Sequence, residues 1–194
     1  MRKMIAGLLL LVLLTGSFSS LAEGRLQTAA AQTVISRFLD KAIDPEAVTR
    51  PLNPETDLKM LRITATEAWL EHGAGTETLL YIAFKVDAKR ADSLPVFLEQ
   101  EHEDRIEYNE ETITLEQFRG NKDLISCELV TGHSWAWYDY SDEGLYIISC
   151  IMNPDIISLN GGSGISFTCW CENLQTGETD KGTITVSLPP MTVH

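Results

Sequence analysis

Basic side chains are scarce in this chain. Its 194 residues include 15 Lys and Arg against 28 Asp and Glu, which gives a formal net charge of −13. Nucleic acids and anionic lipid surfaces are bound largely through positive charge, so this balance makes both poor partners. We therefore expect no nucleic-acid binding and no electrostatic attachment to a membrane.

The chain also lacks a long hydrophobic run. Its longest apolar stretch, Ile5 to Leu14, has ten residues, whereas a membrane-spanning helix needs about 20. Arg2 and Lys3 precede this stretch, and small residues follow it up to Ala22, which is the order of a secretory signal peptide. No cysteine stands directly after the stretch, so lipid attachment through a cysteine at the cleavage site is excluded. We expect a secreted or extracytoplasmic protein, cleaved after Ala22 and without membrane insertion afterwards; the alternative is that the segment is retained as an anchor.

Cleavage would leave 172 residues with 13 basic and 28 acidic side chains, and a net charge of −15. That length fits one domain, with or without an appendage, and is enough to bury a hydrophobic core without disulfides.

Recognisable catalytic and metal-binding motifs are sparse. The glycine-rich segment Gly161–Ile165 lacks the final glycine of a nucleophile elbow, and His102-Glu103 has no second histidine at the spacing of a zinc protease. The segment Asp139–Gly144 copies the start of a calcium loop, but Cys150 occupies the position of the bidentate glutamate. We expect no cofactor and no metal. A hydrolase that uses a pair of carboxylates remains an alternative, because the distance between two such groups is set by the three-dimensional structure and not by their spacing in the sequence.

Hydrophobic periodicity divides the chain into two parts. From Leu26 to Ile43 apolar residues recur every three to four positions, which predicts an amphipathic helix, and Pro51–Pro54 indicates an extended linker. After Lys59 the apolar residues alternate, which predicts seven or eight short strands with no helices between them, and hence a mainly β, antiparallel sandwich. Six of the predicted strands follow the apolar residues of 61–66, 80–86, 125–129, 145–152, 165–171 and 184–188. The predicted domains are 1–22 (signal peptide), 23–57 (helix and linker) and 58–190 (sandwich).

One acidic stretch separates the predicted strands. The segment Glu99–Glu111 holds seven carboxylates, nearly half of the negative excess of the cleaved chain. We interpret it as an exposed hairpin at a sheet edge, turning at Asn109-Glu110, because charged side chains at an edge oppose aggregation.

Together these residues suggest a family. The helix, the linker, the strand pair Leu61–Thr66 and Leu79–Val86 and the closing hairpin that ends at Gly182–Pro189 resemble extracytoplasmic immunoglobulin-like domains of unknown function. Such domains occur in exported proteins of Gram-positive bacteria, some of them attached to membrane-bound anti-sigma factors. The resemblance covers roughly residues 30 to 190 and implies an immunoglobulin-like sandwich. It supplies no catalytic residues, and this chain lacks a sigma-binding region, so a signalling role does not carry over.

All four cysteines are candidates for disulfides. Cys127, Cys169 and Cys171 share the phase of the apolar residues of their strands, and Cys150 shares a face with Ile148 and Met152. A bond between Cys169 and Cys171 is disfavoured, because side chains two apart on a strand are too distant to close. Four cysteines allow three pairing schemes, and the two schemes without that bond remain alternatives, as do four buried free thiols. A zinc site of Cys169, Cys171 and His133 is disfavoured, because the tight loops that let paired cysteines converge are missing.

An aromatic segment supplies the candidate binding residues. In an extended conformation His133, Trp135 and Trp137 lie on one face, and Tyr138 and Tyr140 on the other. Either row is a candidate platform for a sugar ring or an aromatic ligand, and the alternative is ordinary packing. We therefore expect a non-enzymatic exported module that binds a protein, peptide or cell-wall glycan. The alternatives are a small hydrolase with carboxylate acid and base, and a structural spacer without a ligand.

Overall fold

The computed structural model describes residues 33–75, 77–98, 105–108, 111–131, 134–141, 144–151 and 164–194. The chain divides into two compact units, residues 1–47 and residues 48–194. The predicted signal peptide, with its cleavage site after Ala22, lies outside the described residues. Among the described residues, no helix has the length and apolar character needed to cross a membrane.

In the first unit the described residues contain one short helix, α2 (Val34–Phe38). Thr33 caps its N-terminus, because the threonine hydroxyl accepts a hydrogen bond from the Ser36 amide at 3.0 Å. The helix ends at Phe38 with Leu39 as its C-cap, and Asp40 follows with a positive φ of 48°. The predicted helix therefore stops before Ile43, since a left-handed residue cannot continue a right-handed helix; its first part, before residue 33, lies outside the described residues.

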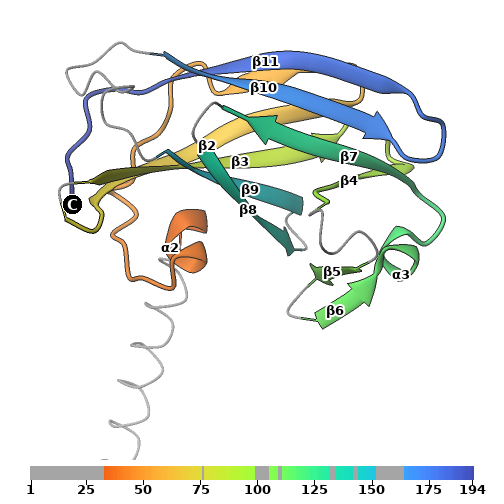
Figure 1. The fold of residues 1–194 in the computed structure, drawn as a ribbon, viewed down its shortest axis with the longest axis horizontal. Coiled ribbons are helices and arrows are strands. Elements are labelled where there is room, and N and C mark those ends of the chain that lie inside the picture. Colours follow the sequence, from red (N-terminus) through yellow and green to blue (C-terminus); the bar gives the residue numbers. More distant parts are fainter. Residues whose placement is uncertain are drawn as a thin grey trace, which may run out of the picture. The chain divides into compact units, whose positions relative to one another are not determined.

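The second unit is mainly β. Its strands form a seven-stranded sheet A in the order β1-β2-β3-β9-β8-β5-β6 and a four-stranded sheet B in the order β11-β10-β7-β4 (Figure 1). The strands are β1 (Glu55–Asp57), β2 (Leu61–His72), β3 (Thr78–Ala88), β4 (Ser93–Val96), β5 (Arg105–Tyr108), β6 (Glu111–Thr114), β7 (Asp123–Val130), β8 (Ser134–Ser141), β9 (Gly144–Ile151), β10 (Gly164–Asn173) and β11 (Thr179–Ser187).

The two sheets share one hydrophobic core. Alternate side chains of β3 and β10 point into it, so that Phe84 of sheet A meets Phe167 of sheet B edge to face, with ring centroids 4.9 Å apart. Both rings are fully buried. The alternation of apolar residues in the sequence thus predicted the inward faces of the long strands and the sandwich-like layering.

A bulge extends β2 beyond its predicted end. The register of β2 against β3 shifts between Ala65 and Glu67, so that Ala65 and Ala68 both face the core. Because a bulge inserts one residue, it resets the alternation and lets the strand continue to His72 with its apolar residues still inside.

Two expectations about the sheets were wrong. The strands are not all antiparallel, since β4 pairs in parallel with β7, and β5 in parallel with β8. A helix, α3 (Leu115–Arg119), also interrupts the strands between β6 and β7. Short strands such as β4, which contains Pro95 at a sheet edge, carry too few alternating residues for a periodicity to appear.

The segment predicted as a linker pairs with the sandwich. Leu52 exchanges two backbone hydrogen bonds with Ser187, the last residue of β11, and β1 pairs with β2. The expected acidic hairpin is present as β5 and β6, whose register pairs Tyr108 with Glu111, and β6 is the last strand of sheet A. The remaining residues of that stretch, 99–104, 109 and 110, lie outside the described residues.

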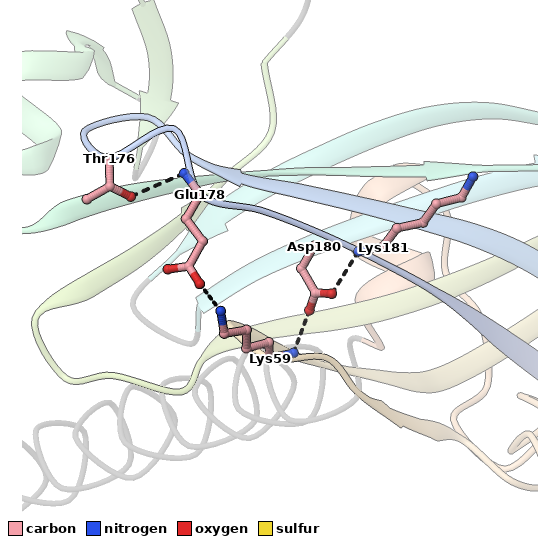
Figure 2. Close-up of polar contacts among 5 residues, drawn as sticks. All are labelled: Lys59, Thr176, Glu178, Asp180 and Lys181. Carbon is pink, nitrogen blue, oxygen red and sulfur yellow. Dashed lines mark hydrogen bonds and ion pairs between the residues drawn. The ribbon is translucent and has the colours of Figure 1, made fainter.

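A polar cluster joins the turn before β2 to the β10–β11 hairpin, as Figure 2 shows. Asp180 accepts hydrogen bonds from the backbone amides of Lys59 at 2.6 Å and Lys181 at 2.8 Å, and the Lys59 ammonium pairs with Glu178. Beside this cluster the Leu58 side chain packs closely on Gly182, because glycine has no Cβ that would occupy this space. One edge of sheet A is thus fixed to one edge of sheet B.

Candidate binding pocket

A pocket of about 590 Å³ opens at the end of the second unit where β4, the β5–β6 hairpin and α3 meet β8 and β9. Figure 1 shows α3 and this hairpin grouped beside β4. The lining residues come from segments far apart in the sequence: Leu94, Pro95, Tyr108, Ile113, Gln117, Phe118, Arg119, Gly120, Asn121, Lys122, Tyr140, Gly144 and Leu145.

A continuous row of aromatic rings forms one wall of the pocket and extends behind it. Neighbouring rings in the row are 5.2 to 5.5 Å apart between centroids, in tilted or edge-to-face contacts. In order, the row consists of Tyr108, Phe118, Tyr140, Tyr138 and Phe97. Because these rings come from β5, α3, β8 and the residue after β4, their contacts hold the separate walls of the pocket together.

Helix α3 owes its position to a capping box. The Thr114 hydroxyl accepts a hydrogen bond from the Gln117 amide at 3.1 Å, and the Gln117 side chain accepts one from the Thr114 amide at 2.9 Å. Gly120 then ends the helix with a φ of 52°, a conformation that other residues adopt at a cost. The helix therefore begins and ends at defined residues, which places Phe118 and Arg119 at the pocket.

The charged side chains in the described lining of the pocket are both positive. Arg119 and Lys122 line it, and no aspartate or glutamate is among the lining residues that the structure describes, although the chain has a net charge of −13. The Arg119 Nε donates a hydrogen bond to the Lys122 carbonyl at 3.0 Å, which fixes the turn between the two residues. Within the described residues neither cation forms an ion pair, and both side chains are exposed. The mouth of the pocket is thus suited to an anionic group.

Tyr140 is a structural residue of the pocket. Its side chain is buried, and its hydroxyl donates a hydrogen bond to the Phe97 carbonyl at 3.1 Å while it accepts one from the Phe97 amide. Burial raises the pKa of Tyr140 far above its ordinary value, so the phenol stays protonated. With both hydrogen-bonding roles used by the backbone, Tyr140 has no proton to exchange with a ligand.

The titratable side chains of the described lining are arginine, lysine and tyrosine. The described lining holds no aspartate, glutamate, histidine, cysteine, serine or threonine, the side chains that usually act as nucleophile or as general acid and base. The described lining thus combines apolar walls with cationic groups at the mouth.

The candidate binding residues of the aromatic segment do not all lie at one site. Tyr138 and Tyr140 pack toward the core side of sheet A, and Tyr140 lines the pocket. Trp137 lies on the other face of β8 and is 38% exposed. The backbone of Trp135 pairs with Cys150, but its side chain and the whole of His133 lie outside what the structure describes. The predicted alternation along β8 is thus observed where it is described.

The four cysteines are buried free thiols in two places. Cys127, Cys169 and Cys171 face the core from sheet B, whereas Cys150 lies on the outer side of β9 in sheet A, opposite Tyr81. Burial raises the pKa of Cys150, Cys169 and Cys171 to about 11. Among the described residues no group of three or more His, Cys, Asp or Glu side chains is arranged to hold a metal ion.

Phe118, Arg119 and Lys122 were not predicted from the sequence as site residues. A signal for them was present, because Thr114 and Gln117 have the spacing of a capping box, which marks the start of a helix.

Comparison of the chain with family models, curated proteins and solved structures finds no match.

Proposed function

We propose that this protein is a non-enzymatic binding module whose pocket takes a peptide segment with an apolar or aromatic side chain beside a carboxylate. The observation that carries the proposal is the composition of the described part of the pocket: aromatic and aliphatic walls, with Arg119 and Lys122 at the mouth and no acidic residue among the described lining residues. An apolar group of the ligand would fill the interior, while its carboxylate would meet the two cations.

The dimensions support a ligand of this kind. The volume of about 590 Å³ falls within the range of roughly 300 to 1,000 Å³ that is common for small-ligand sites. Aliphatic residues such as Leu94, Ile113 and Leu145 stand beside the rings. A sugar has hydroxyl groups over most of its surface and would leave them unpaired against such walls, so these residues favour a peptide side chain over a glycan.

Two finer expectations belong to this proposal. The immunoglobulin-like form of the sandwich is supported by two sheets around one core and by the closing β10–β11 hairpin. Export is supported by the order of basic, apolar and small residues that ends at Ala22. N-terminal sequencing of the protein recovered from the medium or cell envelope of an expressing bacterium tests export, and we expect a chain that begins at Glu23. A mature chain that begins at Met1 would contradict this expectation.

Binding is tested with defined peptides. The probes are acetylated and amidated tetrapeptides that contain phenylalanine beside aspartate, and the same peptides with asparagine in place of aspartate, titrated by calorimetry. We expect the aspartate peptides to bind more tightly, and the double charge reversal R119E/K122E to weaken their binding at least fivefold, the change that about 1 kcal/mol produces.

The matched control is Lys181→Glu, which reverses one charge on the outer face of sheet B, where Lys181 lies over the Trp170 ring. We expect this variant to bind as the wild type does. Equal affinity for both kinds of peptide, or an equal loss in the control variant, would contradict the proposed role of the two cations.

The alternative functions give different results in the same series. Binding of N-acetylglucosamine oligomers in place of peptides would favour a glycan ligand, and cleavage products detected by mass spectrometry after incubation would favour a hydrolase. Absence of binding by every probe would favour the structural spacer.

A further inference from the structure

Three of the four thiols gather on the core side of sheet B. Cys127 belongs to β7, and Cys169 and Cys171 belong to the neighbouring strand β10. The register of the two strands places Cys127 directly opposite Cys171, and Leu129 opposite Cys169. All three side chains are at most 3% exposed.

The hydrogen-bond pattern decides what kind of pair Cys127 and Cys171 form. Further along the same ladder, the Leu174 amide donates to the Leu124 carbonyl at 2.9 Å, so these two opposed residues belong to a hydrogen-bonded pair. Bonded and non-bonded pairs alternate along an antiparallel ladder. Cys171 is three residues before Leu174, and an odd offset along the ladder changes the kind of pair. Cys127 and Cys171 therefore form a non-hydrogen-bonded pair.

This geometry fits a disulfide. Opposed residues of a non-hydrogen-bonded pair have Cα atoms about 4.5 Å apart and side chains that approach each other closely. Disulfides join residues whose Cα atoms are about 4.4 to 6.8 Å apart.

The other pairings do not fit. Cys169 is diagonal to Cys127, at a separation of about 7 to 8 Å that exceeds the reach of a disulfide. Cys169 and Cys171 are two apart on one strand, where the side chains run side by side without meeting. Cys150 belongs to sheet A and faces away from the shared core, which places the thickness of that sheet between it and the other thiols.

We propose that Cys127 and Cys171 form a cross-strand disulfide when the chain folds under oxidising conditions, and that Cys150 and Cys169 remain thiols. The reaction is a thiol–disulfide exchange with an oxidised dithiol compound such as oxidised glutathione. Two S–H bonds of the protein break and one S–S bond forms, while the two electrons and two protons convert the oxidant to two thiols.

The bond forms before the core closes. Exchange requires a thiolate with access to the oxidant, and burial, together with Cys169 and Cys171, raises the pKa of Cys127 far above its usual range. In the folded protein all four thiols are buried. Oxidation of the folded, reduced protein is therefore expected to be slow, and oxidation during refolding fast.

The test is to refold the full chain in oxidised glutathione and to map its cysteines. The chain is unfolded, alkylated without reductant and digested with proteases that cleave after Glu128, Phe167 and Trp170. These cleavages place the four cysteines on four different peptides. We expect alkylation at Cys150 and Cys169 only, and a peptide that contains Cys127 linked to one that contains Cys171, about 2 Da lighter than the sum of the two because two hydrogens have left.

Single serine variants check the assignment. C127S and C171S should each abolish the linked peptide, whereas C150S and C169S should keep it. Because the mapping on the wild-type chain does not depend on whether a variant folds, the proposal stays falsifiable. Four alkylated cysteines after oxidative refolding, or a linked peptide that contains Cys150 or Cys169, would overturn it.

Discussion

The hydrogen bonds of the Tyr140 hydroxyl offer a direct test of how the pocket is held together. Tyr140→Phe removes one oxygen atom and keeps the ring that contacts Phe118 and Tyr138. The hydroxyl bonds both the amide and the carbonyl of Phe97, the residue that follows β4, so its loss leaves two backbone groups without their partner.

The expected loss of stability follows from the burial of these groups. A buried polar group left without a partner costs about 1 to 3 kcal/mol. Tyr140 is only 4% exposed, but Phe97 is half-buried, so water replaces part of the lost bonding. We expect Tyr140→Phe to lower the free energy of unfolding by about 1 to 2 kcal/mol.

The measurement is urea denaturation followed by tryptophan fluorescence. The midpoint should fall while the dependence of the free energy on urea stays unchanged, because the surface exposed on unfolding is the same. The matched control is Tyr81→Phe, which deletes the same atom where the hydroxyl makes only a long hydrogen bond of 3.4 Å to Glu71. A loss for Tyr140→Phe below about 0.5 kcal/mol, the size typical of a neutral surface change, or a loss equal to that of the control, would refute the argument.

Three further predictions follow from single positions. A Cβ added at Gly182 would clash with a methyl carbon of the buried Leu58, so Gly182→Ala should destabilise the fold by about 1 to 3 kcal/mol in the same urea assay. Gly120 has a φ of 52° with open space around it, so Gly120→Ala should cost about 1 kcal/mol from backbone strain alone, and Gly120→Asn less. Burial, with a smaller contribution from Glu71, raises the pKa of Tyr81 to about 12. The phenolate absorbance of Tyr81 should therefore appear late in an alkaline titration and be missing in Tyr81→Phe. The stability that the protonated phenol contributes is complete below pH 10 and is lost as the pH rises toward 12.

The long strands could be predicted because their side chains alternate over many residues. In β10 every second residue from Ile165 to Cys171 is buried, as the sequence indicated, and β9 is buried on both faces, as its continuous apolar run indicated. Short elements escaped prediction. β1 and β4 have three and four residues, which is too few to establish a period, and α3 was missed although Thr114 and Gln117 signal its start.

The candidate site was predicted only in part. Tyr138 and Tyr140 were singled out as aromatic residues of one strand face, and Tyr140 does line the pocket. Arg119 and Lys122 were not singled out, because nothing in their local sequence shows that the turn after α3 lies beside β4 and β9.

The sequence by itself determined which side of each long strand is apolar, because side-chain direction follows from the period of two and needs no knowledge of the partner strand. It also set the charge of the chain and the presence of four cysteines. Only the tertiary structure decided which residues meet: it placed Cys127 opposite Cys171, left Cys150 in the other sheet and brought Leu94, Phe118 and Leu145 into one pocket. The reason is that strand order and register arise from pairing between segments distant in the chain, and a shift of a single residue would change every one of these contacts.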